Sequence, residues 1–118
     1  MDENILESIK ELLPISSDVD AFDNTIMMHI NTVFFTLHQL GVGPKTPYSI
    51  STGEETWSDF LGSDLPDLEA VKTYVYMKVK IVFDPPINSS LLQALKELIA
   101  EYEWRLNVAV DPKLVETE

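Results

Sequence analysis

The sequence predicts an all-α protein, a small bundle of about four helices with a long ordered loop and a short extra helix. Several segments place apolar residues at steps of three and four, the spacing that lines one face of an α-helix. The glycines and several prolines gather in one loop region, residues 41–66, and leave the periodic segments uninterrupted. The chain has 118 residues, of which 45% are hydrophobic, so one domain with a real core is expected.

The first amphipathic segment predicts a helix over residues 3–13. Asp2 is a candidate N-cap because its carboxylate could accept a free backbone N–H, and Pro14 ends the element. One face of this helix is apolar and consists of Ile5, Leu6, Ile9, Leu12 and Leu13.

The second segment predicts a helix over residues 21–40 and has the clearest periodicity in the chain. Asp20 followed by Asp23 is typical of a capping arrangement, and Gly41 is suited to end the helix in a left-handed conformation. The core-facing stripe comprises Ile26, Ile30, Val33, Leu37 and Leu40, widened by Met27 and Phe34. Met28 and Phe35 point away from this stripe.

The loop region, residues 41–66, contains three aromatic residues that need burial, Tyr48, Trp57 and Phe60. An ordered loop is therefore expected. Within it, the segment TWSDFL predicts a short helix, with Thr56 and Asp59 spaced as a capping box. The glycine-containing stretches GVGP and STGEET lack the residues of a phosphate-binding loop.

Residues 68–83 fit two patterns. Apolar and polar residues alternate as in a strand, but the run is longer than a usual strand of about five to six residues. Acidic residues precede basic ones, as the helix dipole favours, and Pro66 and Pro85 mark the two ends. We therefore predict a helix. It is apolar around most of its circumference, so neighbours should cover it on several sides, and other subunits could contribute.

The last helix is predicted over residues 88–106, with the side chain of Asn88 as its cap. Its apolar face comprises Leu91, Leu92, Leu95, Leu98, Ile99, Tyr102 and Leu106. Glu97, Glu101 and Arg105 are spaced for i,i+4 pairs. Residues 1–106 thus form a single helical domain, and residues 107–118 are expected to be a tail that is mobile or adds as a strand to a neighbour.

Composition excludes several functions. A net charge of −12 argues against general binding to nucleic acid or anionic membranes, and no apolar run has the roughly 20 residues that span a bilayer. The chain has no cysteine, and its start, MDENILESIKELL, lacks the apolar core of a signal peptide, so a cytoplasmic location is expected. His29 and His38 lie on opposite sides of one helix and cannot share a metal ion within a subunit. No cofactor, metal or catalytic residue is therefore expected.

Four segments in order, HINTVFFTLHQLGVGP, TWSDFL, VKTYVYMKVKIVFDPP and EYEWRLNV, span nearly the whole chain. In these segments the sequence resembles the small head–tail connector (adaptor, head-completion) proteins of long-tailed phages and prophages. The resemblance implies a structural helical protein that assembles as a homo-oligomeric ring, usually of twelve subunits, around the DNA channel. It further implies contacts with the portal and with further neck or tail proteins, in the virion neck and, during assembly, in the host cytoplasm.

The sequence leaves two other functions open. The first is an acidic cytosolic protein that imitates the charge of DNA and inhibits a host nucleic-acid-binding factor, which would need acidic residues aligned along one surface. The second is a metal-dependent hydrolase, for which the chain offers no short carboxylate-rich motif. The connector function predicts an interface to a second subunit or the portal at residues opposite the main stripes, namely Met28, Phe35, Met77 and Ile81. Alternatively, the loop 41–66 could fold over these residues.

Overall fold

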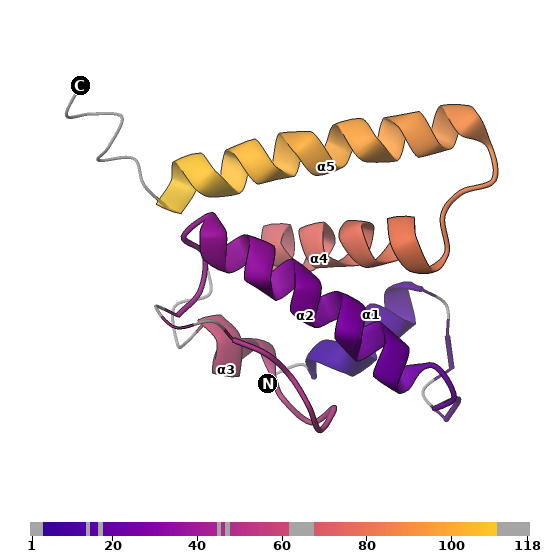
Figure 1. Cartoon of the computed structure of the whole chain (residues 1–118), viewed down its shortest axis with the longest axis vertical. Coiled ribbons are helices and arrows are strands. Elements are labelled where there is room, and N and C mark those ends of the chain that lie inside the picture. The colour runs from indigo at the N-terminus through magenta and orange to yellow at the C-terminus, as the bar shows by residue number, and fades with distance from the viewer. Residues whose placement is uncertain are drawn as a thin grey trace.

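The computed structural model describes residues 4–13, 15–16, 18–44, 46, 48–61 and 68–110. This part of the chain forms an all-α bundle and contains no strand, as predicted (Figure 1). The helices are α1 (Ile5–Leu12), α2 (Asp23–Gln39), the short α3 (Trp57–Leu61), α4 (Leu68–Phe83) and α5 (Ser89–Val110).

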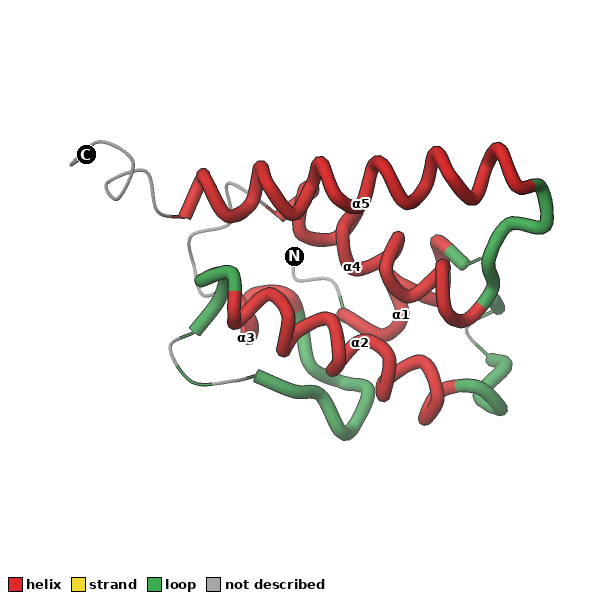
Figure 2. The backbone as a smooth tube through the Cα atoms, turned by 45° about the horizontal axis from the view of Figure 1, so that its top comes forward, coloured by secondary structure: helices red, strands yellow, loops and turns green. Residues whose placement is uncertain are grey.

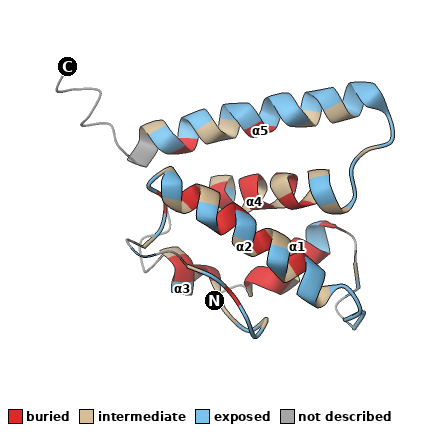
Figure 3. Cartoon of the chain, in the orientation of Figure 1, coloured by how far each residue is buried: buried red, intermediate tan, exposed pale blue. Residues whose placement is uncertain are grey.

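Helix α4 is the centre of the bundle. It contacts α1, α2 and α5, and its buried side chains spread over a wide arc of its circumference (Figure 3). They are Val71, Tyr74, Val75, Met77 and Val79. The prediction of a helix rather than a strand is confirmed for this segment, and so is the expectation that neighbours cover it on several sides.

Helix α5 runs beside α4 as the second arm of a helical hairpin (Figure 2). Asn88 caps it as predicted, because its side-chain oxygen accepts from the backbone N–H groups of Ser90 and Leu91 at 2.8 and 3.2 Å. The helix continues beyond the predicted end at Leu106 and reaches Val110. Residues 111–118 of the predicted tail lie outside the described residues.

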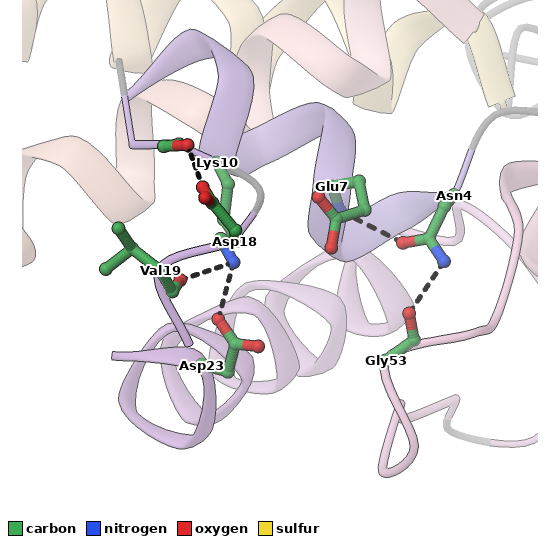
Figure 4. A network of polar contacts seen from close by, with 8 residues as sticks. Asn4, Glu7, Lys10, Asp18, Val19, Asp23 and Gly53 are labelled. Atoms are coloured by element: carbon green, nitrogen blue, oxygen red, sulfur yellow. Dashed lines mark hydrogen bonds and ion pairs between the residues drawn. The ribbon is translucent and has the colours of Figure 1, made fainter. Parts of the chain in front are cut away.

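The start of α1 is capped by Asn4 rather than by the predicted Asp2. The Asn4 side-chain oxygen accepts from the Glu7 N–H at 2.9 Å, and its amide nitrogen donates to the Gly53 carbonyl at 2.6 Å (Figure 4). The Ile5 N–H also donates to the Glu55 carbonyl. The Asn4 side chain therefore has two roles. It caps the first turn of α1, and it attaches α1 to the loop at Gly53.

The start of α2 also differs from the prediction. Phe22 occupies the cap position, and no side chain caps the helix. Asp23 instead pairs with the buried Lys10, at 2.8 Å between Asp23 Oδ1 and Lys10 Nζ (Figure 4). Lys10 Nζ also donates to the Val19 carbonyl at 2.7 Å. One lysine thus joins α1, the connecting segment and the first turn of α2, and the cost of burying its charge is offset by these partners.

The loop between α2 and α4 packs against Phe34 of α2, as the need to bury its aromatic residues predicted. Phe34 stacks on Phe60 with ring centroids 4.4 Å apart, and it meets Tyr48 and Trp57 edge to face. Gly43 has a φ of +95°, and a Cβ there would lie 2.6 Å from the Phe60 ring, so both the turn and the close approach require glycine.

Side chains fix the course of this loop. The Asn31 amide of α2 donates to the Ile50 carbonyl and accepts from the Ile50 N–H, at 2.9 and 2.7 Å. The predicted capping box of α3 is confirmed, since Thr56 N–H donates to Asp59 Oδ2 and Asp59 N–H donates to Thr56 Oγ1. Gly41 ends α2 with a positive φ, also as predicted.

Candidate interaction surface

The structure separates the four residues that were predicted to form an interface. Met28 and Phe35 lie on the outer side of α2 with 58% and 54% of their surfaces exposed. Met77 is only 4% exposed and belongs to the core, and Ile81 is partly buried against that core. Met77 is therefore not available to another subunit.

Helix α5 explains the burial of Met77. Tyr74, which lies on the same side of α4 as Met77, donates its hydroxyl hydrogen to Glu103 of α5 at 2.7 Å. The side of α4 opposite its main stripe is therefore the side that faces α5. Because other helices contact α4 on several sides, the position of Met77 opposite a stripe did not mean exposure.

The alternative in which the loop covers all four residues is also wrong for α2. The loop aromatics pack on Phe34, which is fully buried, whereas its neighbour Phe35, about 100° further around the helix, stays exposed. The exposed outer side of α2 is thus covered by no described part of its own chain.

This outer side contains no charge. Its exposed residues are Asn24, Thr25, Met28, Thr32, Phe35 and Gln39, and we call them the uncharged α2 face. The surrounding sequence, residues 24–44, contains no Asp, Glu, Lys or Arg, although 24% of the whole chain is charged. The cores of protein interfaces are depleted in charged residues and enriched in Met and Phe, so this face has the composition of an interface core.

Some hydroxyl groups on and beside this face form hydrogen bonds to backbone carbonyls of α2 itself. The Thr32 hydroxyl donates to the Met28 carbonyl at 3.1 Å, and the Thr36 hydroxyl donates to the Thr32 carbonyl at 3.4 Å. A hydroxyl that bonds its own helix loses little when water is removed. The face can therefore be covered by an apolar partner without leaving these donors unpaired.

Comparison with known proteins agrees with this picture of an interaction protein. The family model described as Phage connector protein matches residues 5–113. The chain belongs to this family. No curated protein and no solved structure matches it. The resemblance seen in the sequence is thereby confirmed, and the connector protein has a structural role in a phage.

Sequence reasoning missed a second exposed apolar region of the connector. Leu91 and Leu98 were assigned to the core face of the last helix, but both are exposed, as is Trp104. Ile87, between the two helices of the hairpin, is fully exposed. For Ile87 and Leu91 the missed signal was the absence of charge, because residues 85–95 also contain no Asp, Glu, Lys or Arg.

Several described acidic residues of the connector take part in contacts within the chain. Partial burial would raise the pKa of Glu55, but hydrogen bonds from the loop backbone, with Ser51 N–H the first of them, lower it to about 2. Glu103 accepts from Tyr74 and lies 3.8 Å from Lys78, and Glu101 pairs with Arg105 at 2.7 Å. These three carboxylates thus take part in contacts within the chain.

The described residues show no arrangement suited to metal chemistry. In this part of the chain no three His, Asp or Glu side chains gather closely enough to hold an ion. The ring of His29 lies edge to face with Phe83 of α4, at 6.5 Å between centroids. None of the helices described is both long and apolar enough to cross a membrane.

Proposed function

We propose that this connector protein is a component of the virion neck that assembles as a ring around the DNA channel and joins the portal to the tail. Its partners are other copies of itself, twelve in the ring that the resemblance implies, together with the portal protein and further neck or tail proteins. Assembly takes place in the host cytoplasm. The family match supports the structural role, and the exposed apolar residues of the fold support the extensive protein contacts.

The observation that carries this proposal is the uncharged α2 face. A protein of net charge −12 that acted alone would be expected to carry charge on every exposed helix. Instead, α2 presents Met28 and Phe35 to solvent among uncharged side chains. We assign this face to a contact within the assembly, where exposed apolar area becomes buried.

The acidity fits a channel through which DNA moves. Carboxylates that face the channel would repel the phosphates, so DNA would pass without specific binding. We expect the connector to leave the electrophoretic mobility of double-stranded DNA unchanged even at low salt, where binding by basic proteins is strongest. Retardation of DNA in that experiment would contradict this part of the proposal.

Substitution of Phe35 tests the assembly. Phe35→Glu should leave the fold intact, because the side chain is more than half exposed, but it should abolish ring formation or portal binding. An unpaired carboxylate buried in an interface costs about 3 kcal/mol or more. Light scattering of the protein alone measures ring formation, and light scattering of its mixture with a portal protein measures portal binding. Thermal unfolding checks that the fold is intact.

Leu98→Glu is the matched control. It makes the same change from an exposed apolar side chain to a carboxylate, but on α5 and outside the uncharged α2 face. If Phe35→Glu forms the ring and binds the portal as well as Leu98→Glu does, the uncharged α2 face is not an interface.

A further inference from the structure

The connection between α4 and α5 forms a projecting apolar tip. Ile87 is fully exposed, and Leu91 in the first turn of α5 is mostly exposed. Two prolines, Pro85 and Pro86, precede Ile87, and Asn88 after it caps α5 through two backbone hydrogen bonds. We call residues 85–91 the hairpin tip. It lies at the end of the hairpin, where Figure 3 shows mainly exposed residues.

The hairpin tip holds its shape without a partner. Each proline fixes its own φ, and the capped helix fixes the direction in which the chain continues. A segment ordered in advance loses little conformational freedom when it binds. Ile87 therefore has the properties of an interface anchor, a large apolar side chain presented on a rigid support.

The hairpin tip and the uncharged α2 face share one unusual property. Residues 24–44 and residues 85–95 are the two longest stretches of the chain without Asp, Glu, Lys or Arg. Each includes large exposed apolar side chains. The nearest charge on the α4 side of the tip, Asp84, lies 3.8 Å from Lys80 and is thus partly neutralised within its own chain.

Net charge indicates which partner fits two such surfaces. Two copies of a chain of net charge −12 repel each other wherever carboxylates meet. A basic partner could use the acidic surfaces, whereas a second copy meets the least repulsion where charge is absent. The two uncharged regions are therefore the places where copies of this chain approach each other most easily.

We propose that the hairpin tip of one copy docks on the uncharged α2 face of a second copy, an inference that rests on the proposed assembly into a ring. The two regions lie in different parts of the molecule, so one copy can use both at the same time (Figure 1). A contact between unlike surfaces repeats from copy to copy and closes into a ring when the rotation permits. The flexible side chain of Met28 and the ring of Phe35 would receive Ile87.

Two substitutions test this contact in the full chain. Ile87→Glu and Phe35→Glu should each weaken self-association at least about 30-fold, the effect expected of an interface anchor, as measured by light scattering over a range of concentrations. Leu98→Glu should self-associate like the unsubstituted chain. All three variants should keep their thermal unfolding transition, since the three side chains are substantially exposed.

Mixing the two variants distinguishes two kinds of contact. In one, the hairpin tip of one copy meets the α2 face of another; in the other, two identical surfaces meet. Ile87→Glu retains its uncharged α2 face, and Phe35→Glu retains its hairpin tip. The mixture should form a complex of one copy of each and nothing larger, because only one intact contact can be made. If two α2 faces met each other instead, Ile87→Glu would assemble alone, and the inference would be overturned.

A cross-link gives direct evidence. The chain has no cysteine, so Ile87→Cys combined with Phe35→Cys supplies the only two thiols. Oxidation should join separate copies into ladders, and either single substitution should give dimers at most. If the double variant forms no ladder at a concentration at which the unsubstituted protein assembles, or if the unsubstituted protein stays monomeric throughout, the docking is wrong.

The outcomes also separate this inference from the proposed function. Loss of assembly in Phe35→Glu but not in Ile87→Glu would overturn the docking of the tip and leave the role of the uncharged α2 face intact. Normal assembly of both variants would overturn the docking and the proposed α2 interface together.

Discussion

Helices α4 and α5 form one hairpin, yet their surroundings differ. α4 contacts α1, α2 and α5, and five of its side chains are buried. α5 is longer but rests mainly on α4, and among its described side chains only Ile99 and Leu106 are buried. The bundle of α1 to α4 with its loop therefore contains most of the buried apolar area, whereas α5 leaves most of its surface exposed. The stability of the core thus depends mainly on the bundle, and α5 adds to it along one side of α4.

The two tryptophans provide the largest test of this difference. Trp57 of α3 is buried against Phe34, and its indole N–H donates to the Ser8 hydroxyl at 2.9 Å, whereas Trp104 of α5 is 68% exposed. Trp57→Ala should lower the free energy of unfolding by about 3–5 kcal/mol, because it leaves a cavity and removes the hydrogen bond from the indole N–H to the Ser8 hydroxyl. Trp104→Ala should change it by less than about 0.5 kcal/mol.

Chemical denaturation of the two variants measures this prediction. A similar decrease in the free energy of unfolding for both variants would mean that α5 is packed as tightly as the bundle. A decrease for Trp104→Ala alone would mean that α5 contributes more to stability than the bundle does.

The buried ion pair gives the next largest effect. Asp23→Ala should lower the free energy of unfolding by about 3 kcal/mol, because Lys10 would remain charged in the core with only part of its compensation. The double variant Lys10→Met, Asp23→Ala should recover much of the loss, since no buried charge then remains. If the single and double variants unfold alike, the pair has little influence on the bundle.

The contact between α4 and α5 gives the smallest effect and the most local one. Burial and then the Glu103 carboxylate raise the pKa of Tyr74, so its phenol stays protonated and donates to Glu103. Tyr74→Phe removes this bond and should lower the free energy of unfolding by about 1.5 kcal/mol. Hydrogen exchange should quicken in α5 more than in α2. Equal changes in both helices would show that α5 opens only when the whole bundle unfolds.

Most of the fold could be predicted because local signals mark its boundaries. The ends of α4 were predicted correctly, since prolines flank it and its charges follow the helix dipole. Asn88 and the pair of Thr56 and Asp59 cap their helices as their spacing indicated. These features depend on residues a few positions apart, which sequence patterns report directly.

The errors involve residues whose partners are distant in the sequence. Asp23 fits the pattern of a capping residue, but it is drawn to Lys10, whose burial no local pattern reveals. Met77 lies opposite a stripe, but α5 covers that side of α4. On α2, which has a true outer side, the same reasoning located Met28 and Phe35 correctly as exposed residues. Their role in an interface stays a prediction.

The arrangement of the hairpin has a consequence during protein synthesis. α5 is the last described helix to leave the ribosome, and until it forms, the side of α4 that carries Met77 and Tyr74 lacks its cover. The hairpin tip, too, acquires its fixed shape only when Asn88 caps the emerging helix. With the proposed docking, a chain would be able to offer its tip to a neighbour only after α5 has formed.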